Sequence, residues 1–388
     1  MQKKVLVVGC GLSGAVVARE LAEKGYRVTI WERRDHIGGN MYDYRDHHGI
    51  LVQKYGPHTF HTKERYLYDY MCRYADWQEY KLTCGAVWDD TYTPTPFNFT
   101  TIDTFYSKEA AAQLKEKLLQ AFPVQLTATV VEVLQHSDPD IRGYAEFLFQ
   151  NDYAPYTAKQ WGISPSEIDS SVLKRVPLRF SYEEGYFDDP YQVMPSHSFE
   201  YFFQKLLDCP NISVELGRDA LQSLAVSPAG TELLHDGQSL SIPVVYTGAL
   251  DELFGCCHGR LPYRSLRFDW KYEDQESLQA VPVVAYPQIQ GYTRITEYKK
   301  LPPQDVQGTS YTVEYPLPYH PEQVNEPYYP VLTEESKRQY ETYRAMAAQI
   351  PNLILCGRLA DFEYYNMDQA LKRALEVSQS IVASNMLQ

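Results

Sequence analysis

The chain has 388 residues, enough for two or three domains, and its 44% hydrophobic and 22% charged residues are ordinary for a globular protein. A net charge of −14 argues against a nucleic-acid or anionic-membrane surface. No apolar run approaches the roughly 20 residues that cross a bilayer. The chain enters its first strand almost at once, so we expect no signal peptide and a cytoplasmic location. Seven cysteines without C-x-x-C spacing predict reduced thiols and no metal site.

The first predicted strand, Val5–Val8, ends in a glycine-rich turn with a G-x-G-x-x-G pattern, and a helix is predicted over residues 15–24. A strand, this turn and a helix form the dinucleotide-binding fingerprint, in which the glycines let a pyrophosphate approach the backbone. The free N–H groups at the start of the helix favour the phosphates. The residues expected to contact the dinucleotide here are Gly9, Gly11, Leu12, Ser13 and Gly14.

The second predicted strand, Arg27–Trp31, is followed by an acid and then by two glycines. Glu32 lies about 20 residues after the first turn, where a carboxylate binds the ribose hydroxyls of a dinucleotide. The basic pair and the Gly-Gly that follow favour FAD over NAD, because glycines let the backbone approach the cofactor closely. The residues expected to contact the cofactor here are Glu32, Arg33, Gly39 and Asn40.

A Gly-Pro loop over residues 56–62 contains His58 and His61. No third metal ligand is evident, so we expect both histidines to lie beside the cofactor; ordinary loop histidines are the alternative. Residues 84–104 are rich in Thr, Pro and aromatic side chains. Because Pro94 and Pro96 disfavour a central strand, we interpret this stretch as a linker.

A helical insertion is predicted next, with helices over residues 107–122, 129–135 and 141–151, the first capped by Ser107. It ends in two informative stretches, residues 153–162 and 173–180. They interleave aromatic side chains with a lysine and arginines, a composition that suits a base, a ribose and phosphates. A loop of aromatic residues without such a role is the alternative.

The rest of the chain returns to the first domain and adds a sheet. A helix over 198–207 and strands over 212–216, 232–234 and 244–246 precede the turn Thr247-Gly248-Ala249. Alternating patterns over 260–320 predict an antiparallel sheet, on which Arg294 faces either a pocket or solvent. A buried strand over 353–356, a turn and a helix over 367–381 capped by Asn366 complete the chain.

The predicted fold class is α/β. We expect a Rossmann-like FAD-binding domain, a helical insertion domain and a twisted antiparallel sheet domain. The first is discontinuous. The predicted boundaries are 1–84, 190–250 and 330–388 for the FAD-binding domain, 85–180 for the helical domain, and 251–329 with contributions from 180–195 for the sheet domain.

These motifs, taken together, resemble those of the UDP-galactopyranose mutase family along nearly the whole chain. The motifs that carry the resemblance are G-x-G-x-x-G, residues 36–40 and 56–62, Lys159-Gln160-Trp161-Gly162, Lys174-Arg175-x-Pro-x-Arg179-Phe180, Tyr292-Thr293-Arg294, residues 326–330 and Gly357-Arg358-Leu359-Ala360. The resemblance implies an isomerase that interconverts UDP-galactopyranose and UDP-galactofuranose for cell-surface polysaccharide biosynthesis. It also implies FAD as a covalent catalyst through N5, active when reduced by NAD(P)H or dithionite, with no net redox change.

The resemblance also implies site residues. Arg175 and Arg294 would clamp the diphosphate, Tyr156 and Trp161 would contact the uridine, and Arg358 would lie near the FAD phosphates. The implied catalytic residues are Arg175, Arg294 and His58. The implied substrate-binding residues are Tyr153, Tyr156, Trp161, Arg175, Tyr186, Arg294, Tyr328, Tyr364 and Asn366. The further implied cofactor residues are His58, His61, Arg358, Asn366 and Met367.

Two positions depart from the family pattern. Pro155 stands where the family often has glycine, and Asn366 replaces a usual aspartate, so one negative charge is lost. Two other functions remain as alternatives: an FAD-dependent amine oxidase or desaturase, and a non-catalytic nucleotide-sugar binder. The resemblance implies a homodimer and leaves the choice between galactose and its N-acetylated form open.

Overall fold

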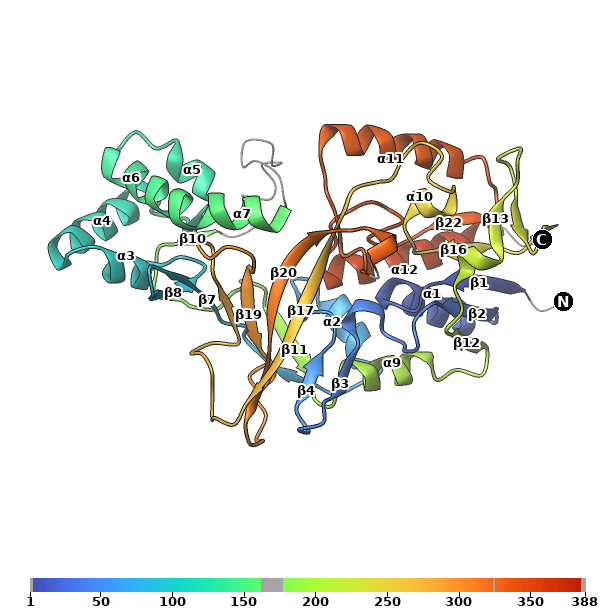
Figure 1. Ribbon diagram of the computed structural model, residues 1–388, viewed down its shortest axis with the longest axis horizontal. Coiled ribbons are helices and arrows are strands. Elements are labelled where there is room, and N and C mark those ends of the chain that lie inside the picture. Colours follow the sequence, from blue (N-terminus) through green and yellow to red (C-terminus); the bar gives the residue numbers. More distant parts are fainter. Residues whose placement is uncertain (1–2, 162–176, 324, 385–388) are drawn as a thin grey trace.

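The computed structural model of the chain describes residues 3–161, 177–323 and 325–384. Figure 1 shows three parts side by side: a parallel sheet with its helices at one end, a large twisted sheet across the middle, and a group of helices at the other end. In the described residues, no helix is both long enough and apolar enough to cross a membrane.

The parallel sheet has the strand order β12-β2-β1-β16-β22, and all neighbouring pairs are parallel. Its strands are β1 (Lys4–Val8), β2 (Arg27–Glu32), β12 (Ile212–Leu216), β16 (Val244–Tyr246) and β22 (Leu353–Leu355). The strand order changes direction at β1: β2 and β12 are added on one side of it, and β16 and β22 on the other. Ligands of open α/β sheets bind at the carboxyl ends of strands at such a point.

Helices pack against this sheet and share its core. Helix α1 (Leu12–Glu23) packs against α12 (Met367–Ala383) and α9 (Phe199–Leu207). The predicted buried strand over 353–356 is only half-buried from Leu353 to Leu355, because β22 forms an edge of the sheet. The helix predicted after this strand is confirmed as α12, with Asn366 as its N-cap. The Asn366 N–H donates to Oε1 of Gln369 at 2.9 Å.

The second sheet has the order β21-β17-β20-β19-β18-β7-β8 and is antiparallel except where β7 pairs with β18. Its strands are β7 (Cys84–Trp88), β8 (Thr91–Thr95), β17 (Tyr263–Glu273), β18 (Val283–Ala285), β19 (Arg294–Glu297), β20 (Thr309–Pro318) and β21 (Tyr329–Pro330). The predicted linker is therefore wrong over residues 84–95, which form a hairpin of this sheet. Pro94 is tolerated because β8 is an edge strand that pairs only with β7.

The helical part follows the hairpin. Its elements are α3 (Phe99–Phe105), α4 (Lys108–Ala121), β9 (Thr127–Ala128), α5 (Val130–Leu134), α6 (Pro139–Leu148), the π-helix η2 (Phe149–Tyr153), α7 (Ala154–Trp161) and β10 (Leu178–Arg179). The predicted cap of α4 is confirmed, since the Ala110 N–H donates to Oγ of Ser107 at 3.3 Å. The π-helix ends two residues before Pro155, whose missing N–H interrupts regular helical bonding.

The remaining elements are short. They are η1 (Gly39–Met41), β3 (Asp43–Arg45), β4 (Leu51–Gln53), β5 (Phe60–Thr62), α2 (Arg65–Cys72), β6 (Trp77–Glu79), β11 (Tyr191–Pro195), η4 (Ala220–Gln222), β13 (Leu224–Val226), β14 (Leu233–His235), β15 (Gln238–Ser239), α10 (Leu250–Leu253), η5 (Pro321–Gln323) and α11 (Glu334–Ala347).

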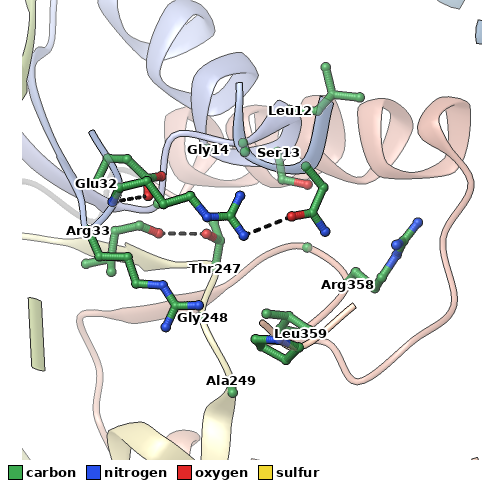
Figure 2. Close-up of a pocket in the computed structure, with 18 of the residues that line it drawn as sticks. Leu12, Ser13, Gly14, Glu32, Arg33, Thr247, Gly248, Ala249, Arg358 and Leu359 are labelled. Atoms are coloured by element: carbon green, nitrogen blue, oxygen red, sulfur yellow. Dashed lines mark hydrogen bonds between the residues drawn. The ribbon is translucent and has the colours of Figure 1, made fainter. Parts of the chain in front are cut away.

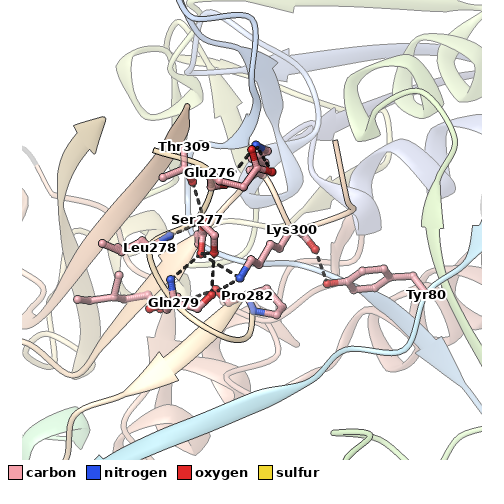
Figure 3. A network of polar contacts seen from close by, with 11 residues as sticks. Tyr80, Glu276, Ser277, Leu278, Gln279, Pro282, Lys300 and Thr309 are labelled. Carbon is pink, nitrogen blue, oxygen red and sulfur yellow. Dashed lines mark hydrogen bonds and ion pairs between the residues drawn. The ribbon is translucent and has the colours of Figure 1, made fainter. Parts of the chain in front are cut away.

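A buried carboxylate fixes the loop between β17 and β18 to the large sheet (Figure 3). Glu297 is fully buried and accepts hydrogen bonds from the N–H groups of Leu278 and Gln279 and from the hydroxyl of Thr309. The Lys300 ammonium lies 3.4 Å from the same carboxylate. The Tyr80 hydroxyl donates to the Lys300 carbonyl at 2.8 Å, which ties residues next to β6 to this network.

Candidate active site

The turn between β1 and α1 lines a cavity (Figure 2). Gly9 has a φ of +98°, and a Cβ built on it would lie 2.1 Å from Oγ1 of Thr247. A Cβ on Gly14 would lie 2.0 Å from the Gly9 carbonyl oxygen. Only glycine fits at these two positions, so the helix start comes close enough to present its N–H groups to the cavity.

Glu32 is fixed at the end of β2. Its side chain is buried and accepts from the N–H of Cys10 at 2.7 Å and from the N–H of Arg34 at 2.9 Å. Each carboxylate oxygen takes one of these bonds and keeps acceptor capacity for a further donor. Because Glu32 lines the cavity, it is placed to receive ligand hydroxyls.

The second glycine pair packs directly on the first turn. A Cβ on Gly39 would lie 2.7 Å from the Gly11 Cα, and the Gly38 N–H donates to the Cys10 carbonyl at 2.9 Å. Two turns from different parts of the chain thus form one continuous backbone surface along the cavity. The adjacent guanidinium of Arg34 donates to Oδ1 of Asn40 at 2.9 Å.

The far wall of the cavity comes from the C-terminal part of the chain. Arg358 donates to the carbonyls of Tyr328 at 3.1 Å and Tyr365 at 2.6 Å. Asn366 and Met367, at the start of α12, lie on the same wall. Every predicted cofactor residue except His61 lines this cavity: Gly9, Gly11, Leu12, Ser13, Gly14, Glu32, Arg33, Gly39, Asn40, His58, Arg358, Asn366 and Met367.

His58 lies where the cavity approaches the large sheet. Its Nδ1 is 2.9 Å from the Gly56 carbonyl, which can only accept, so Nδ1 carries the proton and Nε2 is an unprotonated acceptor in the neutral ring. Burial, together with the nearby positive charges of Arg358 and Arg294, lowers the pKa of His58 to about 4. The imidazole is therefore neutral at physiological pH.

Gln53 fixes the main chain of this histidine. The His58 N–H donates to Oε1 of Gln53, and Nε2 of Gln53 donates to the His58 carbonyl at 3.1 Å. Gln53 itself is buried in β4. One side-chain amide thus satisfies both polar groups of the His58 backbone.

Arg294 and a group of tyrosines lie beyond His58. Arg294 donates through Nε to Oε2 of Glu314 at 2.7 Å, and Glu314 is fully buried. Burial disfavours the charge of Arg294, but Glu314 and the neighbouring Tyr156 and Tyr329 raise its pKa well above the ordinary value. The rings of Tyr329 and Tyr364 stack with centroids 5.2 Å apart. The predicted diphosphate arginine is therefore half-buried beside aromatic side chains.

Two predicted residues, Tyr153 and His61, lie elsewhere. Tyr153 is buried in the core of the helical part, with its ring edge-on to Phe97. His61 pairs with Asp189 and stacks on Phe187. The Tyr186 ring also packs edge-on against Phe187. Arg175 and the side chain of Trp161 lie outside the described residues.

Sequence reasoning missed several residues of the site. Arg34 and Arg218 line the cavity, and the Arg218 guanidinium lies 3.8 Å from the ring centroid of Trp31. Arg218 belongs to no motif and reaches the site only because β12 pairs with β2. For Glu314, the sequence offers one indication of a role in the site, namely a charged residue at an alternating strand position. For Gln53 it offers none.

Comparisons with known proteins agree with this geometry. Family models match residues 151–364 as UDP-galactopyranose mutase and residues 7–74 as an NAD(P)-binding Rossmann-like domain. A dTDP-fucopyranose mutase from Escherichia coli is 34% identical over 98% of this chain and 99% of its own length. A UDP-galactopyranose mutase from Mycoplasma pneumoniae is 33% identical over 97% of this chain and 96% of its own length.

The fold agrees as well. A crystal structure of reduced UDP-galactopyranose mutase superposes with a TM-score of 0.72 at 14% identity, covering 99% of this chain and 94% of that one. At this identity the structural match shows the fold alone. The family model spans more than half of the chain, and the relatives span nearly all of it. The chain belongs to the UDP-galactopyranose mutase family.

Proposed function

We propose that the protein is a flavin-dependent isomerase that interconverts UDP-galactopyranose and UDP-galactofuranose. The observation that carries this proposal is the lining of the cavity, which extends from the glycine turn at Gly9 to His58, close to the half-buried Arg294. Family membership supports the reaction class. An oxidase or desaturase, the first alternative, has no need of an arginine held by a buried carboxylate to bind a diphosphate.

We propose FAD as the cofactor. The two glycine turns leave room for a pyrophosphate, Glu32 retains acceptor capacity for ribose hydroxyls, and Arg358 lies on the facing wall. When bound and reduced, the flavin would supply a nucleophile for the anomeric carbon of the sugar without net oxidation. These residues would hold the flavin against the substrate and exclude water.

Arg294 would hold the diphosphate while the sugar changes its ring. A leaving diphosphate that must return needs a fixed cationic donor, and a guanidinium locked by Glu314 supplies one without reorganisation. Arg175 would act with it, and Tyr186, Tyr328 and Tyr364 would donate hydroxyl bonds. Tyr156 and Trp161 would contact the uridine.

His58 would act beside the flavin as a neutral acceptor. Its Nδ1–H donates to the Gly56 carbonyl, so Nε2 would accept a hydrogen bond from a ligand hydroxyl or a flavin N–H. Asn366 would lie near the cofactor at the start of α12, where it cannot add the negative charge of the usual aspartate.

The choice of nucleotide and sugar is part of the proposal. The relatives include mutases named for UDP-galactopyranose and for dTDP-fucopyranose at nearly equal identity. We propose the UDP-galactose pair because the family model carries that description. A cytoplasmic location, a homodimer and a role in supplying galactofuranose to cell-surface polysaccharides belong to the same proposal.

The test is a substrate panel. The dithionite-reduced protein is incubated with UDP-galactofuranose, UDP-N-acetylgalactosamine or dTDP-fucopyranose, and the products are separated by chromatography. We expect conversion of UDP-galactofuranose to UDP-galactopyranose, and FAD as the flavin released on denaturation. Preferred conversion of the dTDP sugar would show that dTDP-fucopyranose is the substrate. Release of no flavin would overturn the proposal.

A further inference from the structure

Lys159, near the end of α7, makes three contacts that no ligand role requires. Its ammonium donates to the carbonyl oxygens of Tyr286 at 2.6 Å, Ile289 at 2.6 Å and Tyr292 at 2.8 Å. A lysine ammonium has three donors, so all of them are used by one loop, between β18 and β19. The sequence suggested phosphate binding for the stretch that contains this lysine, but no N–H of Lys159 remains for a phosphate.

The β18–β19 loop, which accepts these three bonds, leads directly to Arg294 of the proposed diphosphate site. Tyr292 precedes Arg294 by two residues, and Arg294 is the first residue of β19. On the other side, Tyr156 lies one helical turn before Lys159, and residues three apart share a face of a helix. Tyr156 contributes to raising the pKa of Arg294, so the phenol and the guanidinium are neighbours.

Two further bonds join α7 and η2 to the large sheet. Arg264 of β17 donates through Nε to the Gln160 carbonyl at 3.0 Å, and Gln288 donates through Nε2 to Oδ1 of Asn151 at 3.2 Å. These contacts flank Lys159 without replacing it, because each supplies one bond and neither reaches the Tyr292 carbonyl. Lys159 therefore makes the largest number of bonds between the end of α7 and this loop among the residues described.

We propose that Lys159 is a positioning residue: by fastening α7 to the β18–β19 loop, it holds Tyr156 beside Arg294 and thereby sets the affinity of the nucleotide diphosphate site. This inference rests on the proposed function, because Tyr156 and Arg294 are assigned there to the nucleotide and the diphosphate. Lys159 would contact neither ligand, because its three N–H groups donate to backbone carbonyls. Its effect passes through the two residues that it aligns.

The protonation of Lys159 gives this role a signature. Burial lowers its pKa to about 8, while the Asp152 carboxylate raises it. The other titratable groups facing it are the phenols of Tyr286 and Tyr292, whose pKa values are raised by burial, and Asp152, whose pKa is raised to about 7. A neutral amine has only two N–H donors, so above pH 8 one of the three carbonyls loses its partner. An arginine at this position stays charged.

The experiment measures the dissociation constant of UDP for the flavin-loaded protein by titration calorimetry, between pH 7 and pH 9. The variants are Lys159→Met and Lys159→Arg, with Lys117→Met as the matched control, because Lys117 pairs with Asp138 and Asp140 away from the site. We expect Lys159→Met to weaken UDP binding about tenfold or more. We expect wild-type affinity to fall above pH 8, and the fall to be absent in Lys159→Arg.

A double-mutant cycle separates positioning from direct contact. If Lys159 acts through Tyr156, Lys159→Met should add little in a Tyr156→Ala background; full additivity would overturn the inference. Unchanged UDP affinity in Lys159→Met would overturn it as well. If Lys159→Met does not fold, an alkaline fall in affinity that persists in Lys159→Arg would still overturn it. No UDP affinity in the wild-type protein would instead contradict the proposed function, on which this inference depends.

Discussion

Arg294 and Glu314 lie directly opposite each other on neighbouring strands, and their side chains form a 2.7 Å ion pair inside the large sheet. The hydroxyl of Thr296 donates to the other oxygen of Glu314 at 2.7 Å. The register of β19 against β20 thus fixes the orientation of the guanidinium before any ligand arrives. Preorganisation of this kind is what makes a cationic donor effective toward charge that develops during a reaction.

Replacing Arg294 by Ala should lower kcat/KM while flavin content stays normal. The loss should correspond to about 2–4 kcal/mol of transition-state stabilisation. Arg294→Lys should recover only part of this loss, since an ammonium cannot reproduce the forked geometry. Steady-state kinetics and flavin absorbance give both numbers, and Arg142→Ala serves as the control, since Arg142 lies on α6 with 42% of its side chain exposed. Wild-type turnover in Arg294→Ala would show that the diphosphate binds elsewhere.

Glu314→Gln should destabilise the fold more than its conservative size suggests. The amide keeps the shape of the side chain but removes the charge that offsets burial of Arg294, so we expect a loss of about 3–5 kcal/mol in the free energy of unfolding. Chemical denaturation followed by fluorescence measures it. A loss below about 1 kcal/mol, the usual size for an exposed pair, would contradict the buried role of Glu314.

His58 should make stability depend on pH in a defined window. Its pKa is lowered from 6.5 to about 4 in the folded protein, so between these values the unfolded chain binds a proton that the folded chain does not. The contribution of His58 is therefore present above pH 6.5 and is lost as the pH falls toward 4.

The check compares urea denaturation of the wild-type protein with that of His58→Gln across this range. As the pH falls from 6.5 toward 4, the wild-type protein should lose more unfolding free energy than the variant does. Asp43 and Asp251, whose pKa values burial raises to about 6, titrate in both proteins and cancel. Parallel pH profiles would mean that His58 is not held neutral by its surroundings.

Two helical glycines allow a matched test of the cradle. Gly14→Ala should disrupt the packing of α1 on the first turn and reduce flavin retention, because its Cβ would lie 2.0 Å from the Gly9 carbonyl oxygen. Gly143→Ala in α6 meets no atom within 4 Å and should stabilise the protein by about 0.5–1 kcal/mol. Flavin content and unfolding curves distinguish them; equal behaviour of the two variants would argue against close packing at Gly14.

The sequence predicted the cradle well because its constraints are local. A glycine turn, an acid at the next strand end and an N-cap such as Ser107 act within a few residues, so each leaves a readable pattern. The β7–β8 hairpin was missed because Pro94 argues against a strand unless its position at the sheet edge is known. Gln53 and Glu314 were missed because their partners, His58 and Arg294, are set by folding and by strand register.

The family resemblance predicts a ligand role for two residues that the structure does not place at the site. Tyr153 was expected at the substrate and His61 at the flavin, yet one packs in the helical core and the other pairs with Asp189. Their motif neighbours Tyr156 and His58 lie at the site. A motif therefore indicates a stretch of chain, and the helix face or strand alternation decides which of its side chains reach the ligand.

The central claim is that this chain is a mutase whose reaction needs reduced flavin but consumes no reducing equivalents. The most direct measurement follows UDP-galactofuranose conversion by chromatography in the same preparation, first oxidised and then reduced with dithionite under anaerobic conditions. We predict no conversion in the oxidised state, and many turnovers per flavin after a single reduction. Full activity of the oxidised enzyme, or product limited to one equivalent per flavin reduced, would contradict the account.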